Sequence, residues 1–252
     1  MLDNHRSITT VGIYLRSLRT IMNIAKDKKL LTPEMYPFGM KSKKKYEIPI
    51  GKNIKKALNI DDVKKIKQHI CHSQEAEFAR DLWLFSLYCN GMNMADIFSL
   101  KYGDIKEDFF YFNRQKTIRT QKVHAPIEIY LSDPIKTIIE KWGNKVIAKE
   151  NYIFGIYRTG LSAEELYNLK KNTIRQINGY MSRIGKQLGI DTKLTTYVAR
   201  HFWATLLRNL GTSVEEISES LGHSNIATTK SYLDSFPKEH KKETANKLTS
   251  LL

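Results

Sequence analysis

Cysteine is scarce in this chain of 252 residues, which contains only Cys71 and Cys89. Both lie in segments predicted to be helical, so we expect no disulfide scaffold and a reducing cytoplasm as the location. His69 and His72 lie next to Cys71, but no second cluster of ligands completes a tetrahedral metal site. The sequence therefore predicts neither disulfides nor a bound metal.

Long apolar stretches are also missing. No segment reaches the roughly 18 apolar residues that a membrane helix requires, and the N-terminus lacks the apolar region of a signal peptide. Hydrophobic residues still make up 41% of the chain, and its length suffices for a buried core in one large or two modest domains. We expect a soluble intracellular protein without membrane contact.

Acidic residues are in deficit. Lys and Arg together number 41 against 26 Asp and Glu, which gives a net charge of +15. A strongly basic protein attracts polyanions, most simply nucleic acid, by contacting phosphates and releasing their counterions. The charge therefore favours DNA or RNA binding. It could also serve solubility alone, so it does not specify the partner further.

The beginning of the chain is predicted to form a small helical domain and a linker. Apolar residues recur at helical spacing over residues 7–30, where Ser7 is placed to cap the first turn. Prolines, glycines and the lysine run over residues 41–45 then interrupt the pattern, and these lysines are either solvated or in contact with a phosphate backbone. We predict a domain over residues 1–45 and a linker over residues 46–58.

The rest of the chain is predicted to be mainly α-helical with one small antiparallel β-sheet. Helices are expected from residues 59–62 onward, over 76–90 and over 94–100, and again after Pro134 apart from residues 152–157. Two or three short strands are predicted within residues 108–114, around Val123 and within 127–131. We expect one domain over residues 59–236, followed by a C-terminal helix over 237–252.

Three residues near the C-terminus form a pattern with a defined chemistry. Tyr232 follows His223 by nine residues, and Arg200 lies upstream in YVARHFWAT. A phenol can attack a DNA phosphate, but with an unperturbed pKa of about 10 it requires nearby cations or a base. Arg200 offers a planar fork that matches a phosphate, and His223 can donate a hydrogen bond to the same group. Lys116 lies between two predicted strands, where a hairpin can bring its ammonium group to the leaving oxygen.

These motifs resemble those of the tyrosine recombinase, or phage integrase, family. The order helix, LGH, turn, helix and tyrosine is a specific signature of that family, and ARHFWATLL is similar to its second arginine box. SLYCNGMNMADIFSLKYGDI resembles its first box, and RQKT places a lysine where the family has one on a strand. YCNGMNMAD and TYVARHFWATLL look most like integrases of mobile elements in Bacteroides-type bacteria. The resemblance extends over about residues 7–236.

The resemblance implies a fold and a reaction. The fold is the tyrosine recombinase catalytic domain of DNA breaking-rejoining enzymes, preceded by a partial helical core-binding (SAM-like) domain. The reaction is site-specific cleavage and rejoining of DNA through a 3′-phosphotyrosyl intermediate, by which a mobile element is integrated or excised. Tyr232 would be the nucleophile, Arg200 and His223 would bind the phosphate, and Lys116 would be the general acid.

The resemblance also implies partners and a location. No cofactor or metal is expected, because the phosphotyrosine bond conserves the energy needed for rejoining. The expected partners are double-stranded DNA, a homotetramer on that DNA in which the C-terminal helix docks onto a neighbouring protomer, and accessory DNA-bending proteins. The expected location is the bacterial cytoplasm, at the nucleoid.

Two positions depart from the family pattern and reduce the expected positive charge. Asn93 stands where the first box has an arginine, although some integrases of the Bacteroides type also have a small polar residue there. Tyr197 stands three residues before the second arginine, where most members have histidine or lysine. Arg114 and Arg119, which flank Lys116, are the candidates to reach the phosphate in place of the missing arginine.

Other functions stay open on the sequence alone. One alternative is a weakened homologue that binds DNA without strand exchange. The missing first arginine, and an N-terminal domain with room for about two helices instead of the family's usual four, would suit it, whereas the presence of Tyr232, His223 and Arg200 argues against it. A type IB topoisomerase shares the chemistry but needs no partner protomer. An RNA-binding protein would account for the charge but not for Tyr232, His223 and Arg200.

Overall fold

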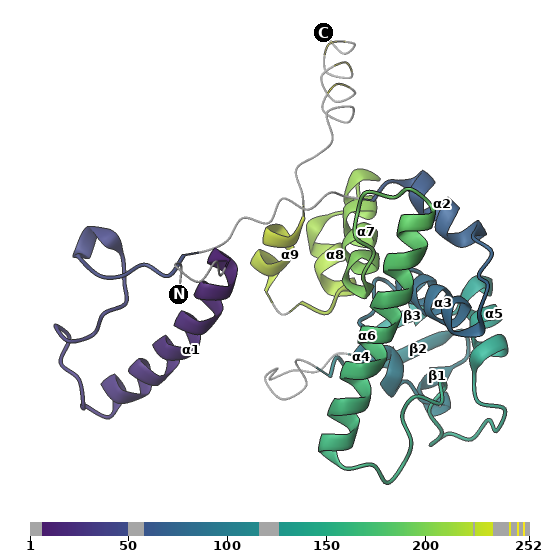
Figure 1. Ribbon diagram of the computed structural model, residues 1–252, viewed down its shortest axis with the longest axis horizontal. Helices are drawn as coiled ribbons and strands as arrows, with labels where there is room; N and C mark the ends of the chain where they lie inside the picture. Colours follow the sequence, from purple (N-terminus) through teal and green to yellow (C-terminus); the bar gives the residue numbers. More distant parts are fainter. Residues whose placement is uncertain are drawn as a thin grey trace. The chain divides into compact units, whose positions relative to one another are not determined.

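The computed structural model describes residues 7–49, 58–115, 126–223 and 225–233, with three isolated residues of the C-terminal tail (Figure 1). It divides into two compact units, residues 1–55 and 56–252. The strand expected around Val123 lies outside the described residues, as do Lys116 and Arg119. The limits and roles of the predicted domains, and the docking of the C-terminal helix, stay predictions.

The first unit is built on one long helix, α1 (Ile8–Asp27), which begins where the sequence predicts. The side chain of Ser7 accepts a hydrogen bond from the backbone N–H of Thr10 at 3.2 Å and so caps the first turn. Ile13 and Ile21 on this helix are 54% and 63% exposed. The described residues of this unit therefore leave an apolar side of α1 uncovered.

The loop after α1 is held by Lys45. Its Nζ donates to the carbonyl oxygens of Pro33 at 2.9 Å and Glu34 at 3.0 Å, and also to that of Tyr36. These acceptors use the three donors of an ammonium group. Lys45 is thus part of the loop, and the expectation of a solvated or phosphate-bound lysine is wrong for this residue. The short 3-10 helix η2 (Lys41–Lys43) is exposed.

The core of the second unit surrounds α3 (Gln74–Tyr88). Leu82, Trp83 and Phe85 are completely buried. Three helices pack on α3, namely α5 (Asp133–Trp142), α6 (Ala163–Gln187) and α7 (Thr196–Asn209) (Figure 1). A helix covered on several sides has to be apolar nearly all round, as the aromatic content of residues 76–90 predicts.

The ends of α3 differ from the prediction by two residues. The helix begins earlier because the side chain of Ser73 caps it by accepting from the backbone N–H of Ala76 at 3.2 Å. It ends at Tyr88, and Asn90 and Gly91 then adopt left-handed backbone angles with φ of +53° and +65°. This turn faces α7 and contributes to the site described below.

The small sheet has three antiparallel strands in the order β1 (Ile105–Lys106), β2 (Phe109–Phe112) and β3 (Ile127–Tyr130). Phe110 pairs with Ile129, and both are buried. The rings of Phe110 and Phe85 lie 6.2 Å apart, so the sheet packs on α3. The structure confirms the strands predicted in 108–114 and 127–131, whereas the two-residue β1 was not predicted. Lys116 lies in the connection between β2 and β3.

Four further helices and one 3-10 turn complete the described part of this unit: α2 (Ile60–Gln68), α4 (Met94–Ser99), η3 (Tyr102–Asp104), α8 (Val214–Ser220) and α9 (Ile226–Tyr232). Asn59 and Asp62 form a capping box at the start of α2. The non-helical stretch predicted over 152–157 forms two isolated β-bridges, through Tyr152 and Phe154. The predicted fold class, mainly α with one small antiparallel sheet, is confirmed.

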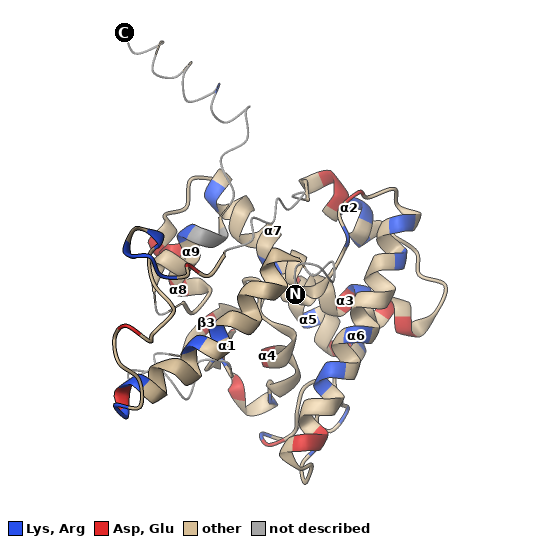
Figure 2. Ribbon diagram, turned by 60° about the vertical axis from the view of Figure 1, so that its left-hand side comes forward, with Lys and Arg blue, Asp and Glu red and all other residues tan. Residues whose placement is uncertain are grey.

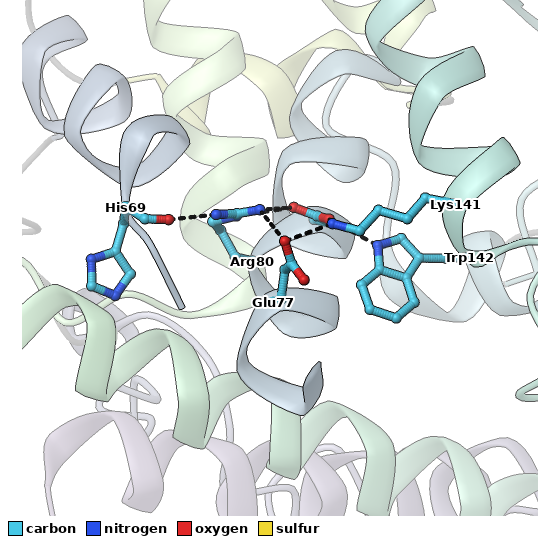
Figure 3. A network of polar contacts seen from close by, with 6 residues as sticks. His69, Glu77, Arg80, Lys141 and Trp142 are labelled. Carbon is cyan, nitrogen blue, oxygen red and sulfur yellow. Dashed lines mark hydrogen bonds and ion pairs between the residues drawn. The ribbon is translucent and has the colours of Figure 1, made fainter. Parts of the chain in front are cut away.

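A network of polar contacts around Arg80 and Lys141 ties α3 to α5 and to the end of α2 (Figure 3). Asp81 is 5% exposed and accepts hydrogen bonds from Arg80, Lys141 and Trp142 at 2.7–2.9 Å. Arg80 also donates to the carbonyl oxygen of His69. Burial alone would raise the pKa of Asp81, but the hydrogen bonds from these side chains outweigh it and the pKa lies below its usual value. Asp81 is therefore charged at neutral pH.

The exposed face of α6 is basic. Lys171, Arg175, Arg183 and Lys186 are exposed along it, whereas the acidic residues of this helix lie in its first turn (Figure 2). This arrangement suits a polyanionic partner. Of the helices in the described residues, none has both the length and the apolar character needed to cross a membrane.

Candidate active site

Two neighbouring helices hold the start of α7, the helix that carries Arg200. The indole Nε1 of Trp83 on α3 donates to the carbonyl oxygen of Thr195 at 3.0 Å. The backbone N–H of Thr196 donates to Oδ1 of Asn178 on α6 at 2.8 Å, which replaces the side-chain cap that Thr195 does not supply. The position of Arg200, about one turn further along, is thereby fixed relative to the core.

Arg200 is buried at a junction of three segments. Its side chain is 5% exposed. Nη1 donates to the carbonyl oxygen of Gly91 at 2.9 Å, and Nη2 donates to that of Leu221 at 2.8 Å. Nη2 also lies 3.2 Å from Nε2 of His223. The structure thus brings two of the predicted phosphate-binding residues together, with a permanent positive charge in the interior.

The close approach of α7 to the turn after α3 requires a glycine at position 91. Gly91 has a φ of +65°, and a Cβ there would lie 2.8 Å from Cα of Arg200. Real Cβ atoms do not approach backbone that closely, so a side chain would displace either the turn or α7. Gly91 therefore allows its own carbonyl oxygen to reach the guanidinium of Arg200.

His223 links Arg200 to the helix that carries Tyr232. Nδ1 of His223 lies 2.8 Å from Oγ1 of Thr229, whose side chain is completely buried. Thr229 and Tyr232 lie three residues apart on α9 and hence on the same side of the helix. The side chain of Tyr232 lies outside the described part of the structure, so its role stays a prediction.

Arg114 is a second arginine at the site. Its Nη1 donates to the carbonyl oxygen of Gly222 at 3.0 Å, next to His223 in the chain. Arg114, Arg200 and Asp96 line one small pocket together with mostly apolar residues. The structure therefore places Arg114 beside Arg200, whereas Arg119 lies outside the described residues.

Asn93, at the position of the family's first arginine, is directed toward a carboxylate. Its Nδ2 donates to Oδ2 of Asp96 at 3.3 Å, and Oδ1 of Asp96 accepts from the backbone N–H of Gln115 at 2.9 Å. Asp96 is 3% exposed. This carboxylate therefore connects the start of α4 to the segment after β2, one residue before Lys116.

Tyr197 lies at the surface of the first turn of α7. Its side chain is 46% exposed, and its ring lies 6.4 Å from that of His201. His201 itself is 8% exposed. The structure therefore places Tyr197 on a more open side of α7 than Arg200, which is interior.

Cys89 lines the same pocket as the two arginines. Its side chain is completely buried, and burial raises the pKa of its thiol well above the usual value. The thiol therefore stays protonated at neutral pH, and since the thiolate is the reactive form, this cysteine is a poor nucleophile.

Sequence reasoning missed the groups that hold the charged side chains. The carbonyl oxygens of Gly91 and Leu221 carry no signal in the residue type, because any residue supplies a carbonyl. Asp96 and Thr229 have a weak signal: each lies three residues from a predicted site position, the spacing at which residues share a helix face.

Comparison with known proteins agrees with these motifs. The model of the Phage integrase family matches residues 56–239. Tyrosine recombinase XerD of Listeria monocytogenes serotype 4b (strain F2365) is 23% identical over 90% of this chain and 72% of its own. Tyrosine recombinase XerA of Thermococcus kodakarensis (strain ATCC BAA-918 / JCM 12380 / KOD1) is 25% identical over 73% of this chain and 59% of its own. The chain thus spans roughly 60–70% of the length of these relatives.

A solved structure shows the same fold. The Tn1549 transposon integrase in complex with circular intermediate DNA superposes with a TM-score of 0.65, at 15% identity, over 98% of this chain and 82% of that one. The family match and the fold confirm the resemblance drawn from the sequence. They do not test the individual site residues, whose roles stay predictions.

Proposed function

The chain belongs to the phage integrase family, and from this premise we propose that it is a site-specific tyrosine recombinase. It cleaves and rejoins double-stranded DNA through a 3′-phosphotyrosyl intermediate and thereby integrates or excises a mobile element. The observation that carries the proposal is the Arg200–His223 contact of 3.2 Å, which Thr229 links to the helix ending at Tyr232. A homologue that binds DNA without cleaving it is not favoured, because the relatives are named recombinases.

Phosphate binding falls to Arg200, His223 and Arg114. A phosphodiester in the transition state gains negative charge on its non-bridging oxygens, and fixed donors aimed at these oxygens stabilise it. Arg200 supplies a charge that does not titrate, and burial among fixed carbonyl groups keeps the guanidinium in place. We assign to Arg114 the charge that Asn93 lacks, since Arg114 lines the same pocket as Arg200.

The covalent step uses Tyr232 and Lys116. The phenol oxygen of Tyr232 forms a bond to phosphorus as the bond from phosphorus to the 5′ oxygen breaks. The phenol gives its proton to solvent water, the ammonium group of Lys116 protonates the departing 5′ oxygen, and the resulting amine regains a proton from solvent. Rejoining reverses these steps with the 5′ hydroxyl of the new strand. The role given to Lys116 rests on the similarity of RQKT to the family's strand-borne lysine, and Gln115, the last described residue before it, donates its backbone N–H to Asp96.

The partners follow from the same proposal. Double-stranded DNA is supported by the net charge of +15, by the basic face of α6, and by the DNA present in the solved Tn1549 integrase complex. We further propose a homotetramer on DNA with the C-terminal helix docked onto a neighbour, accessory DNA-bending proteins, and action at the nucleoid in the bacterial cytoplasm.

The test is formation of a covalent adduct. The protein is mixed, without added metal, with a nicked suicide duplex from the junction of its own element, and the products are separated on a denaturing gel. We expect a protein–DNA adduct that is lost in Tyr232→Phe and kept in Tyr167→Phe, a matched change at a 55% exposed tyrosine. Specific binding of the duplex by the wild type without any adduct would contradict the proposal and favour the non-cleaving homologue.

A second substrate separates recombination from topoisomerase activity. Supercoiled plasmid without the element's junction should stay supercoiled in the presence of the recombinase. Relaxation of this plasmid, dependent on Tyr232, would favour a type IB topoisomerase.

A further inference from the structure

The imidazole of His223 has a defined partner at each ring nitrogen. Nε2 lies 3.2 Å from Nη2 of Arg200, and Nδ1 lies 2.8 Å from Oγ1 of Thr229. The two partners differ in what they can do: a guanidinium only donates hydrogen bonds, whereas a hydroxyl both donates and accepts. This difference allows the position of the ring proton to be derived.

Arg200 determines the state of Nε2. Since a guanidinium has no acceptor, the contact at 3.2 Å is a hydrogen bond only when Nε2 presents its lone pair. A neutral imidazole carries one proton, which then resides on Nδ1. Nδ1–H donates to Oγ1 of Thr229, and the short distance of 2.8 Å agrees with a direct hydrogen bond.

Thr229 is placed to hold this arrangement. Its side chain is completely buried, so water does not readily substitute for its hydroxyl. It lies on α9, which ends at Tyr232, so the hydrogen bond also fixes His223 relative to that helix. The neighbouring Thr228 is exposed by comparison.

Thr229 also suits the change that His223 undergoes in the proposed reaction. Because Nδ1 already carries the proton of the neutral ring, donation from Nε2 to a phosphate oxygen requires a second proton, taken up from solvent, and makes the ring an imidazolium. Nδ1 carries a proton in both the neutral and the charged form, so its hydrogen bond to Thr229 is the same in both. The ring therefore keeps its orientation while Nε2 changes from acceptor toward Arg200 to donor toward phosphate.

We propose that Thr229 is a positioning residue: it accepts the Nδ1–H of the tautomer that Arg200 selects, and so fixes the ring orientation of His223 relative to the helix of Tyr232. The catalytic consequence rests on the proposed function, whereas the tautomer does not. Residues that orient a catalytic histidine through its second nitrogen have large effects in other enzymes, often 10-fold to 100-fold or more.

The first experiment measures the tautomer in the DNA-free protein. Long-range ¹H–¹⁵N correlation spectra distinguish protonated from unprotonated ring nitrogens, and His223→Gln identifies the signals of His223. At a pH where the ring is neutral, we expect the proton on Nδ1. Thr229→Val, which removes the hydroxyl with little change in shape, should shift the resonance of the Nδ1-bound proton because its acceptor is lost, whereas Thr229→Ser and Thr228→Val should not.

The second experiment measures the rate of adduct formation on the nicked duplex. We expect Thr229→Val to lower this rate about 10-fold to 100-fold with unchanged affinity for the duplex, and Thr229→Ser to stay within about 3-fold of the wild type. Loss of DNA binding together with cleavage in Thr229→Val would indicate a general structural role and contradict the inference.

The two experiments test different claims, so one claim can be refuted without the other. A proton on Nε2 in the wild type overturns the tautomer assignment even if no variant folds. A shifted Nδ1 proton resonance in Thr229→Val with an unchanged rate of adduct formation overturns the positioning role. A wild type that has the expected tautomer but forms no adduct contradicts the proposed recombinase function and leaves the assignment of the proton intact.

Discussion

Replacing Gly91 with alanine tests how closely α7 and the turn after α3 have to approach. The left-handed backbone at φ +65° costs a residue with a Cβ about 1 kcal/mol. The new Cβ would also lie 2.8 Å from Cα of Arg200, which is backbone and not the end of a flexible side chain. Relieving such overpacking typically costs about 1–3 kcal/mol. We therefore expect Gly91→Ala to lower the free energy of unfolding by about 2–4 kcal/mol.

Gly189→Ala is the matched control. Gly189 has nearly the same φ, +66°, but a Cβ there would meet nothing within 4 Å. This variant should show the backbone cost of about 1 kcal/mol alone. Urea unfolding of both variants isolates the steric contribution, and adduct formation should decrease in Gly91→Ala because the guanidinium of Arg200 moves with its helix. Equal destabilisation and equal cleavage by the two variants would refute the reasoning.

Two further predictions concern charged residues. Asp81→Asn should lower the free energy of unfolding at neutral pH by about 2–3 kcal/mol, because Arg80 and Lys141 lose a buried partner. The fold lowers the pKa of Asp81. Its contribution to the free energy of unfolding is therefore present above the unfolded-state pKa of about 3.9 and is lost as the pH falls through the folded-state pKa. The free energies of unfolding of the wild type and Asp81→Asn should converge in acid, and a difference that stays constant with pH would contradict the assignment. Arg114→Ala should slow adduct formation about 100-fold, in the range found for lost transition-state donors. Normal cleavage by Arg114→Ala, by Arg119→Ala and by the double variant would exclude compensation for Asn93.

The sequence predicts the elements of the fold because their signals are local. Helical spacing and Ser7 locate α1, and Asn59 with Asp62 locates the start of α2. The strand β1 escapes prediction because two residues carry no periodicity, and it exists only through its pairing with β2. The observed ends of α3 differ from the predicted ones because the cap formed by Ser73 and the left-handed turn at Asn90 determine where the helix begins and ends, and the apolar pattern does not.

Two of the charged residues at the candidate site have sequence motifs, whereas the groups that hold them have none. Arg200 and His223 have sequence motifs, and the structure brings them together. The carbonyl oxygen of Gly91, by contrast, lies 109 residues away from Arg200 in the chain, and nothing local indicates the contact. The same holds for Lys45, whose role depends on the path of the loop around it.

The attachment point of the DNA tests the central claim most directly. The adduct from the nicked duplex is digested with nuclease and trypsin, and the modified peptide is sequenced by mass spectrometry. We predict a 3′-phosphate linkage on Tyr232, within the tryptic peptide SYLDSFPK. A linkage on any other residue, or through a 5′-phosphate, would contradict the account.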